Sequence, residues 1–184
     1  MMLDVGCGNK KRIGFIGIDI NPETDADIIC DLNKFPYPFK ESTFDEIYVD
    51  NVLEHLDDIK NVMSEIYRIS KPGGSVIIKV PYFRSRYAFI DQTHKHFFTT
   101  QSFTYFSPTH IHHRLYNYYI GTFETTAIRF NENFPLKWYN KIWLLFIIIC
   151  NRYPEYYDHH LGHIFPLDEL TFYLKTIKSN GDSK

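Results

Sequence analysis

The chain has 184 residues, 44% of them hydrophobic, and carries a net charge of −2. This length suits one domain with a full hydrophobic core rather than two small domains. The near-neutral charge, without a long basic tract, argues against a nucleic-acid-binding protein. Three cysteines without metal-binding or redox spacing predict a reduced, cytoplasmic setting.

The composition differs between the two halves of the sequence. Residues 1–80 hold 9 Lys and Arg against 14 Asp and Glu, whereas residues 81–184 hold 11 against 8. Of the 32 Phe, Tyr and Trp residues, 25 lie after residue 80. The mildly basic, aromatic second half is therefore suited to an anionic or ring-bearing substrate.

Four short apolar runs in the first 50 residues predict strands. They are Met2–Val5, residues 15–19, residues 26–30 and Phe44–Asp50. Only residues 6–14 separate the first two, and a parallel crossover usually needs about a dozen residues or more. The first helix is therefore predicted to be a single turn or missing.

A helix and a fifth strand are predicted next. Apolar residues recur at helical spacing from 59 to 69, behind the capping candidates Asp57 and Asp58. The sequence Lys-Pro-Gly-Gly at 71–74 is predicted to end this helix and to turn the chain into a β-branched strand over residues 75–82.

Two later segments, residues 122–130 and 170–177, are also strand-like and would form an antiparallel end of the sheet. Strands that alternate with helical patterns predict an α/β fold, with right-handed crossovers and a largely parallel sheet.

A Gly-x-Gly turn directly follows the first predicted strand. Gly6 and Gly8 accept positive φ angles and let a ligand approach the backbone. In open α/β sheets, ligands bind beyond the carboxyl ends of the strands, where this turn lies. Lys11 replaces the third glycine of a dinucleotide-binding motif, which favours an adenosine ligand without phosphates over a pyrophosphate.

Two aspartates follow at the ends of the next two predicted strands. The carboxylate of Asp19 is placed to accept hydrogen bonds from both hydroxyls of a ribose. Asp31 could accept one from an exocyclic amine such as that of adenine, with Leu32 beside the ring. The alternative is that both are turn or cap aspartates, which are common at strand ends. Their joint occurrence after Gly-x-Gly favours the binding interpretation.

Five segments in a fixed order carry a family resemblance. They are Leu-Asp-Val-Gly-Cys-Gly (3–8), Gly-Ile-Asp-Ile-Asn (17–21), Cys-Asp-Leu-Asn (30–33), Phe-Asp-Glu-Ile-Tyr-Val-Asp-Asn-Val-Leu-Glu-His-Leu (44–56) and Lys-Pro-Gly-Gly (71–74). Together they resemble the motifs of class I S-adenosylmethionine-dependent methyltransferases, most closely those of the methyltransferase-11-like branch. Asp-Gln-Thr-His-Lys-His-Phe-Phe-Thr (91–99) is similar to a further segment of that branch.

The resemblance implies an α/β, Rossmann-like, doubly wound fold with a mostly parallel seven-stranded sheet and an antiparallel edge strand. It implies one domain with a cofactor-binding half, residues 1–82, and an acceptor and lid half, residues 83–184. The implied cofactor is S-adenosyl-L-methionine. The implied reaction is methyl transfer to a small-molecule acceptor or a lipid- or glycan-linked one, at oxygen.

The resemblance also assigns residues to the cofactor. Gly6, Cys7 and Gly8 would line its methionine part, and Asp19 would hold the ribose. Ile20, Asp31, Leu32, Asn51 and Val52 complete the residues that the resemblance assigns. We also predict cofactor contacts from Asp4, Asn21 and His55, although His55 has the alternative of capping or packing near the next helix.

Residues after the fifth predicted strand are candidates for removing a proton from the acceptor. The sulfonium methyl group is already activated, so catalysis needs in-line positioning and a general base. Histidine is a side chain that can act as a general base near neutral pH, which makes His94 and His96 candidates, and Asp91 is close enough in sequence to orient one of them. The alternative for either histidine is a hydrogen bond within a loop.

The other histidines do not predict a metal site. Three of them crowd residues 110–113, and His159 and His163 are spaced i, i+4. No cysteine or second carboxylate–histidine motif accompanies them, and Gly162 weakens a helix there. We therefore expect no bound metal.

The longest apolar run, residues 142–150, is nine residues long and too short for a membrane span of roughly 20. It predicts a buried helix. The alternative, suggested by flanking aromatic residues, is an interfacial helix that gives peripheral membrane contact through residues 138–153.

Two other functions remain open. An NAD(P)-dependent oxidoreductase would share the Gly-x-Gly turn and Asp19. A non-catalytic relative would bind the cofactor, or a partner protein, through the aromatic second half.

Overall fold

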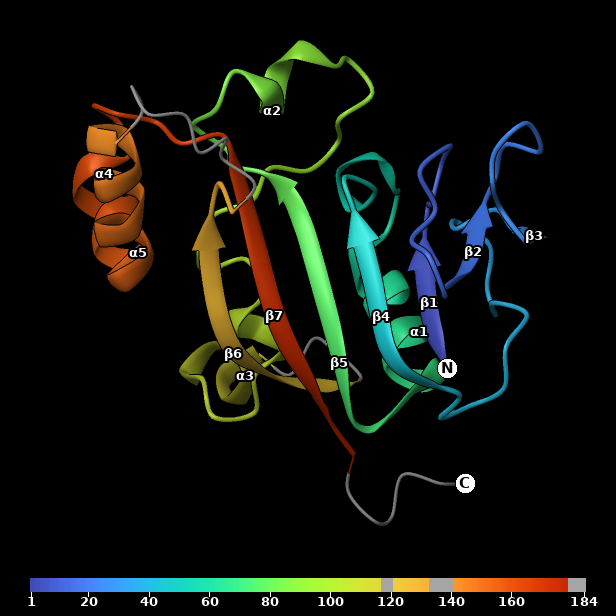
Figure 1. Cartoon of the computed structure of the whole chain (residues 1–184). Coiled ribbons are helices and arrows are strands. Elements are labelled where there is room, and N and C mark those ends of the chain that lie inside the picture. The colour runs from blue at the N-terminus through green and yellow to red at the C-terminus, as the bar shows by residue number, and fades with distance from the viewer. Residues whose placement is uncertain (117–120, 133–140, 179–184) are drawn as a thin grey trace.

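A seven-stranded sheet organises the molecule (Figure 1). The structure is a computed structural model that describes residues 1–116, 121–132 and 141–178. The strand order is β3-β2-β1-β4-β5-β7-β6, and every neighbouring pair is parallel except those that β7 makes with β5 and β6. The strands are β1 Met2–Val5, β2 Ile16–Asp19, β3 Ile28–Ile29, β4 Phe44–Asp50, β5 Ser70–Pro81, β6 Thr122–Phe130 and β7 Glu169–Ile177.

The sheet confirms the predicted Rossmann-like α/β fold and its antiparallel end. The strand that reverses direction is β7, and it lies between β5 and β6, so that β6 forms the outer edge. Fully buried side chains from four strands, Leu3, Ile18, Ile47 and Val76, lie in the core of the molecule.

The helices are short apart from two. They are α1 Ile59–Ile69, α2 Tyr87–Ile90, α3 Ile111–Tyr116, α4 Lys141–Arg152 and α5 Pro154–Tyr156, with 3-10 turns η1 Leu53–His55 and η2 Thr104–Phe106 and a π turn η4 Tyr157–Leu161. Residues 6–15 contain no helix, which confirms the prediction for the first crossover. The Gly6 and Cys7 N–H groups both donate to the Ile18 carbonyl, at 2.7 and 3.2 Å, so this connection stays against β2.

Helix α1 forms as predicted. The Asp58 side chain caps it by accepting the Asn61 N–H, and its apolar residues from Val62 to Ile69 are buried. The strand predicted to begin at residue 75 begins five residues earlier, at Ser70. The Lys-Pro-Gly-Gly sequence lies within β5 at an irregularity of its pairing with β4, because Gly73 has a φ of 75° there.

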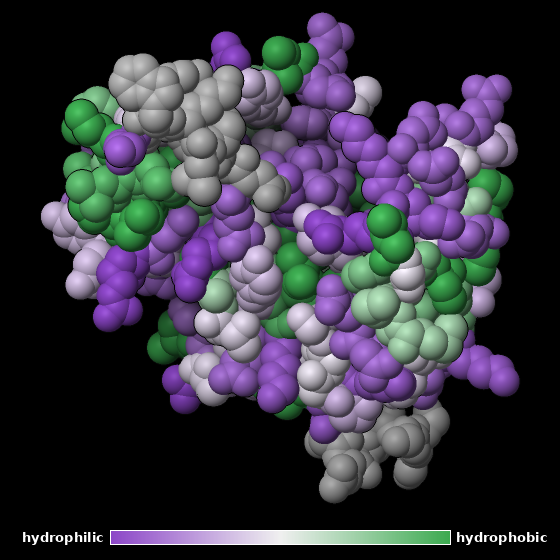
Figure 2. All heavy atoms as spheres, viewed as in Figure 1, coloured by the Kyte–Doolittle hydropathy of each residue, from purple (hydrophilic) through white to green (hydrophobic). Residues whose placement is uncertain are grey.

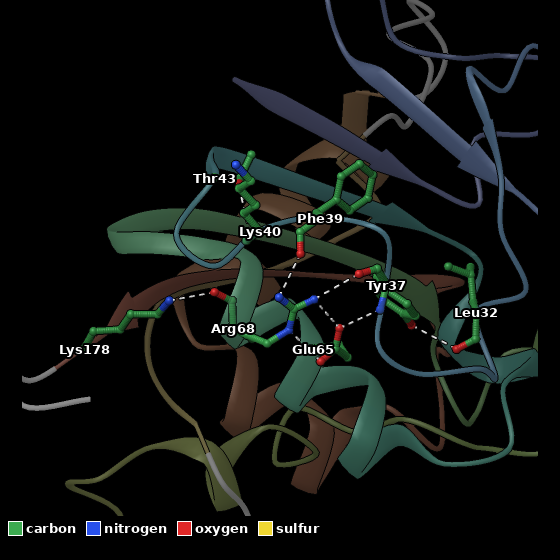
Figure 3. Close-up of polar contacts among 8 residues, drawn as sticks. All are labelled: Leu32, Tyr37, Phe39, Lys40, Thr43, Glu65, Arg68 and Lys178. Carbon is green, nitrogen blue, oxygen red and sulfur yellow. Dashed lines mark hydrogen bonds and ion pairs between the residues drawn. The ribbon is translucent and has the colours of Figure 1, made fainter. Parts of the chain in front are cut away.

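A polar network fixes the connection between β3 and β4 on helix α1 (Figure 3). Arg68 pairs with Glu65 at 2.7 Å and donates to the carbonyls of Tyr37 and Phe39. Glu65 in turn accepts the Tyr37 N–H at 2.8 Å, and the buried Tyr37 hydroxyl donates to the Leu32 carbonyl at 2.9 Å. This network therefore holds the backbone of Leu32 in place.

The long apolar run forms helix α4 beside β6, but the prediction that it is buried is wrong for most of it. Ile147 and Cys150 are buried, whereas Ile142, Leu145 and Ile148 are more than half exposed, since among the described residues nothing covers that face. A hydrophobic patch over α4 is visible in Figure 2. Within the described parts of the chain, no helix is both long and apolar enough to cross a membrane.

Candidate active site

Three cavities lie beyond the carboxyl ends of the parallel strands and share Asn51. The aspartate cavity, about 360 Å³, is lined by Gly6, Asp19, Ile20, Asp31, Leu32, Asn33, Asn51, Val52, His55 and Leu56. The glycine-loop cavity, about 570 Å³, is lined by Asp4, Gly6, Cys7, Gly8, Asn9, Lys10, Arg12, Tyr48, Asp50, Asn51 and Lys79. The histidine cavity, about 460 Å³, is lined by Asn51, Glu54, His55, Pro81, Tyr87, Ile90, Asp91, His94, Asp168 and Glu169.

Asn51 lies where the three cavities meet, directly after β4. It has a φ of 52°, which is rare for a residue other than glycine, and its N–H donates to the Lys79 carbonyl of β5 at 2.9 Å. Strained backbone of this kind clusters at functional sites. The shared lining makes the three cavities parts of one cleft across the strand ends.

The two glycines of the predicted turn serve different purposes. Both have positive φ angles, 67° at Gly6 and 52° at Gly8. A Cβ atom at Gly6 would lie 2.3 Å from Cγ2 of Val52, whereas a Cβ atom at Gly8 would meet nothing within 4 Å. Gly6 therefore lets Val52 pack against the loop, and Gly8 leaves open space in front of it.

The polar groups of the aspartate cavity come from the ends of β2 and β3. The Asp19 carboxylate accepts the Gly8 N–H at 2.9 Å on one oxygen and the Asn21 N–H at 2.9 Å on the other. Asp31 accepts the Asn33 N–H at 3.0 Å, which holds the pKa of the Asp31 carboxyl below its usual range. Each carboxylate oxygen has a second lone pair, so both aspartates can still accept bonds from a ligand.

Ile20 and Leu32 supply apolar surface to the same cavity. Ile20 is 61% exposed and presents its apolar surface to the cavity, and Leu32 is buried. The aspartate cavity thus combines acidic hydrogen-bond acceptors with an apolar wall, as expected for a ribose and an adenine ring. Of the residues predicted to bind the cofactor, only Asn21 contributes no lining to this cavity or the glycine-loop cavity.

The glycine-loop cavity carries charges of both signs. Asp4 is 4% exposed and accepts the Arg12 N–H at 2.8 Å, and burial raises the pKa of its carboxyl. The Arg12 guanidinium stacks 3.3 Å above the centre of the Tyr48 ring. Burial raises the pKa of the Cys7 thiol to about 11, so this cysteine stays protonated at neutral pH. The sequence interpretation missed Arg12 and Lys10, whose signal was only their nearness to the glycine turn.

The histidine cavity brings together two of the three predicted catalytic residues. His94 and Asp91 line it, whereas His96 is not part of its lining. The Nε2 atom of His96 donates to the Leu56 carbonyl at 2.8 Å, because a carbonyl oxygen can only accept. The Nδ1 atom of His94 likewise donates to the Ala88 carbonyl at 3.0 Å, so the Nε2 atom of the neutral ring is an acceptor, without a partner in the described part of the chain.

Asp91 orients a different histidine from the two predicted. Its carboxylate accepts the Thr93 hydroxyl at 2.7 Å, so the Thr93 oxygen accepts a hydrogen bond from Nδ1 of His55, at 2.8 Å. The rings of His55 and His94 meet edge to face, with centroids 4.7 Å apart. Burial, together with the His94 ring, lowers the pKa of His55.

Glu54 is the functional candidate that the sequence interpretation missed. It is 1% exposed, lines the histidine cavity, and neither carboxylate oxygen has a hydrogen-bond partner among the described residues. Burial raises the pKa of its carboxyl to about 7. The only sequence signal was a glutamate set among apolar residues, Val-Leu-Glu-His-Leu, at 52–56.

Comparisons with known proteins agree with this geometry. Residues 3–78 match the sequence profile of a family described as "Methyltransferase domain". A ubiquinone/menaquinone biosynthesis C-methyltransferase from Desulfotalea psychrophila is 37% identical over 68 residues, which cover 37% of this chain and 24% of that protein. The 24-methylenesterol C-methyltransferase 2 of Arabidopsis thaliana is 28% identical over 99 residues, covering 41% of this chain and 27% of the relative.

Among solved structures, an S-adenosylmethionine-dependent methyltransferase from Archaeoglobus fulgidus aligns over 95% of this chain and 85% of its own. Its TM-score is 0.54 and its sequence identity 21%, so it is similar in fold. The chain spans only about a quarter of the length of each curated relative described here.

Proposed function

We propose that this chain, whose residues 3–78 match the methyltransferase domain family, binds S-adenosyl-L-methionine and transfers its methyl group to a small molecule. The observation that carries the proposal is the continuous cleft in which the aspartate, glycine-loop and histidine cavities meet at Asn51. Such a cleft has room for a nucleoside, an amino acid and an acceptor side by side.

The residues present fit the cofactor. In the aspartate cavity, the Asp19 carboxylate would accept hydrogen bonds from the ribose hydroxyls, and Ile20 would cover the adenine ring. The Asp31 carboxylate would accept a hydrogen bond from the adenine amine. The open space at Gly8 and the mixed charges of Asp4 and Arg12 suit the zwitterionic methionine part. When bound, this cofactor supplies a methyl group on a positively charged sulfur.

The histidine cavity is the proposed acceptor site. Pro81, Tyr87 and Ile90 give it an apolar side, which suits a lipid-linked or other hydrophobic acceptor. The free Nε2 atom of His94 can take a proton from an acceptor hydroxyl, so we propose methylation at oxygen. Asp91 acts as a positioning residue through Thr93, and His96 through its bond to Leu56.

The two halves of the chain would then divide the work. Residues 1–82 bind the cofactor, and residues 83–184 shape the acceptor site and its cover. The segment that carries α2 rises above the carboxyl ends of the central strands (Figure 1). The Lys95 and His96 N–H groups donate to the Glu54 carbonyl, at 2.7 and 3.3 Å, and hold this segment against η1.

Titration calorimetry with S-adenosylmethionine, S-adenosylhomocysteine and NAD tests the cofactor. We expect binding of the first two, no binding of NAD, and a loss of binding in Asp19→Ala. NAD binding alone would contradict the proposal and support an oxidoreductase. That alternative is disfavoured because residues 6–15 provide no helix N-terminus for a pyrophosphate. Binding without turnover in a screen of hydroxylated acceptors would favour the non-catalytic relative.

We also propose that α4 gives the protein a peripheral contact with membranes. Ile142, Leu145, Ile148 and Ile149 are each more than half exposed along this helix, in keeping with a lipid-linked acceptor. The predicted contact region begins at residue 138, and its first three residues lie outside the described part.

Flotation with phosphatidylcholine–phosphatidylglycerol vesicles tests this contact. The double variant Leu145→Ser, Ile149→Ser should lose vesicle binding. The matched control Ile13→Ser, at a fully exposed isoleucine in the first crossover, should keep it. Equal flotation of all three proteins would overturn the proposal.

A further inference from the structure

Three side chains of the histidine cavity form a group with the composition of a metal site. One ligand atom from each of Glu54, His55 and His94 lies within 4.8 Å of the other two. Two imidazoles and one carboxylate are a common ligand set for Zn²⁺ and other first-row transition metals. Among the described residues, this is the group of three His, Cys, Asp or Glu side chains with such proximity.

The buried carboxylate of Glu54 is an independent indication of a ligand. Glu54 is 1% exposed, and neither of its carboxylate oxygens has a hydrogen-bond partner among the described residues. Buried polar groups are almost always hydrogen-bonded. A bound cation would satisfy these oxygens, and the same side chain already faces the cavity. Asp91 adds a further negative charge to the lining.

His55 and His94 each make the hydrogen bond through the second ring nitrogen that is typical of metal-binding histidines. A ligating imidazole generally donates its other ring N–H to a carbonyl or to a carboxylate-linked group, which fixes its tautomer. The Nδ1 atom of His94 donates to the Ala88 carbonyl, and that of His55 donates to Thr93, which in turn donates to Asp91. In the neutral tautomers that these bonds fix, each Nε2 atom carries a lone pair, and neither has a hydrogen-bond partner among the described residues.

We propose that Glu54, His55 and His94 bind one divalent transition-metal ion, with a fourth position open to the histidine cavity. Ligands of tetrahedral Zn²⁺ lie roughly 3.4 Å apart, given metal–ligand distances near 2.1 Å, so small side-chain rotations would close the site. This inference departs from the sequence-based expectation of no metal. The metal site itself goes beyond the proposed methyl transfer and does not depend on it, whereas its role toward the acceptor rests on that proposed function.

An ion at this place would change the role assigned to His94. As a ligand through Nε2, His94 could no longer accept the proton of the acceptor. The ion would instead supply Lewis acidity to an oxygen atom of the acceptor, and the proton of its hydroxyl would pass to solvent. The site therefore predicts acceptors that offer an oxygen ligand.

Metal binding is tested on the purified 184-residue chain after removal of metals with a chelator. Calorimetry with Zn²⁺ alone should show one ion per chain, and Co²⁺ should give the visible absorption of a tetrahedral site. Glu54→Gln and His94→Gln should each weaken Zn²⁺ binding at least tenfold. Thr93→Val, which removes the partner of His55, should weaken it by roughly 10- to 100-fold.

His163→Gln, at an exposed histidine outside the cleft, is the matched control and should bind Zn²⁺ as the unchanged protein does. Circular dichroism and S-adenosylmethionine binding show whether each variant is folded, so a metal defect is separable from loss of the cofactor site. Absence of a one-to-one complex would overturn the proposal. So would binding that Glu54→Gln and His94→Gln leave unchanged, because the ion would then lie on other histidines.

Discussion

Carboxylates at the two ends of the cleft have opposite surroundings. Asp4, Asp19 and Asp31, at the ends of the first three strands, each accept a backbone N–H from a residue no more than eleven positions away. Glu54, after the fourth strand, has no partner among the described residues although it is more deeply buried. Turns therefore satisfy their own aspartates, whereas no described residue satisfies Glu54, which the proposed metal ion would do. Burial of a polar group without a hydrogen-bond partner lowers the stability of the folded state.

The largest effect on stability is expected from a substitution in the glycine turn at the cofactor-binding side of the cleft. Gly6→Ala would force a positive φ on alanine and drive its Cβ atom into Val52, so the free energy of unfolding should fall by about 3 kcal/mol. Gly14→Ala is the matched control, since its φ of 84° is also positive but its Cβ atom would lie 3.6 Å from Met2, an ordinary contact. Denaturant unfolding should show a clearly smaller loss for the control. Equal losses would mean that strain alone, and not the Val52 contact, decides.

The second effect concerns Asp19, whose lone pairs are shared between its turn and the proposed ribose. Asp19→Ala should weaken S-adenosylmethionine binding about 30-fold, or ~2 kcal/mol, because hydrogen bonds to a charged group are lost. Asp27→Ala removes a comparable bond, from the carboxylate that accepts the Gly17 N–H, outside the cavity lining. Calorimetry should show that Asp27→Ala binds S-adenosylmethionine with an affinity within about twofold of that of the unchanged protein. A matching loss in both variants would show that the turn, and not the carboxylate, matters.

The third effect concerns the polar network of Glu65, Arg68 and Tyr37 that holds the backbone of Leu32 (Figure 3). Glu65→Gln should lower the free energy of unfolding by about 1.5 kcal/mol at pH 7, because Arg68 loses its charged partner. Burial alone would raise the pKa of Glu65, but bonds from Arg68 and from the Tyr37 N–H outweigh it and hold that pKa below 4.5.

The pH dependence of this effect follows from the lowered pKa. The stabilisation is complete above the unfolded value of 4.5 and disappears as the pH falls through the lower folded value. Urea unfolding from pH 7 to pH 3 should therefore show the two proteins converging in acid. Glu41→Gln, at an exposed glutamate, should show no such convergence. A constant gap across this range would contradict the assignment.

The fourth effect tests the comparison directly. Glu54→Met replaces an unpaired buried carboxyl with an apolar side chain of similar length, so metal-free protein should gain about 1 kcal/mol of stability. Asp4→Ala should lose about 1 kcal/mol, because it leaves the Arg12 N–H without its acceptor. Thermal unfolding of the two variants should show a gain of stability for Glu54→Met and a loss for Asp4→Ala. A loss in Glu54→Met would mean that the fold itself requires this carboxylate.

The smallest effect is expected on α4. Ile142 is 87% exposed, so Ile142→Ser should change the free energy of unfolding by less than about 0.5 kcal/mol. Ile147→Ser, at the buried face of the same helix, should cost several times more. Urea unfolding of both variants measures the difference. Similar losses would show that something covers Ile142 in solution.

Local patterns explain what could be predicted. The capping Asp58, the absence of a first helix and the positive φ angles at Gly6 and Gly8 depend on neighbours within a few residues. Asp19 was identified for the same reason, because a strand end and a glycine turn fix where its carboxylate lies. The early start of β5 was missed because pairing with β4 extends the strand into a Pro-Gly-Gly sequence.

The sequence alone determined the α/β class, the order of the cofactor motifs and the acidic strand ends, since periodicity, turns and caps are short-range properties. Only the tertiary structure decided which histidines face the cleft. His94 meets His55 and Glu54 across about 40 positions, whereas His96 turns to the Leu56 carbonyl. It also decided that Glu54 stays unpaired and that one face of α4 is bare among the described residues. These features depend on which distant segments pack together, because a side chain's surroundings are fixed by packing rather than by its neighbours in sequence.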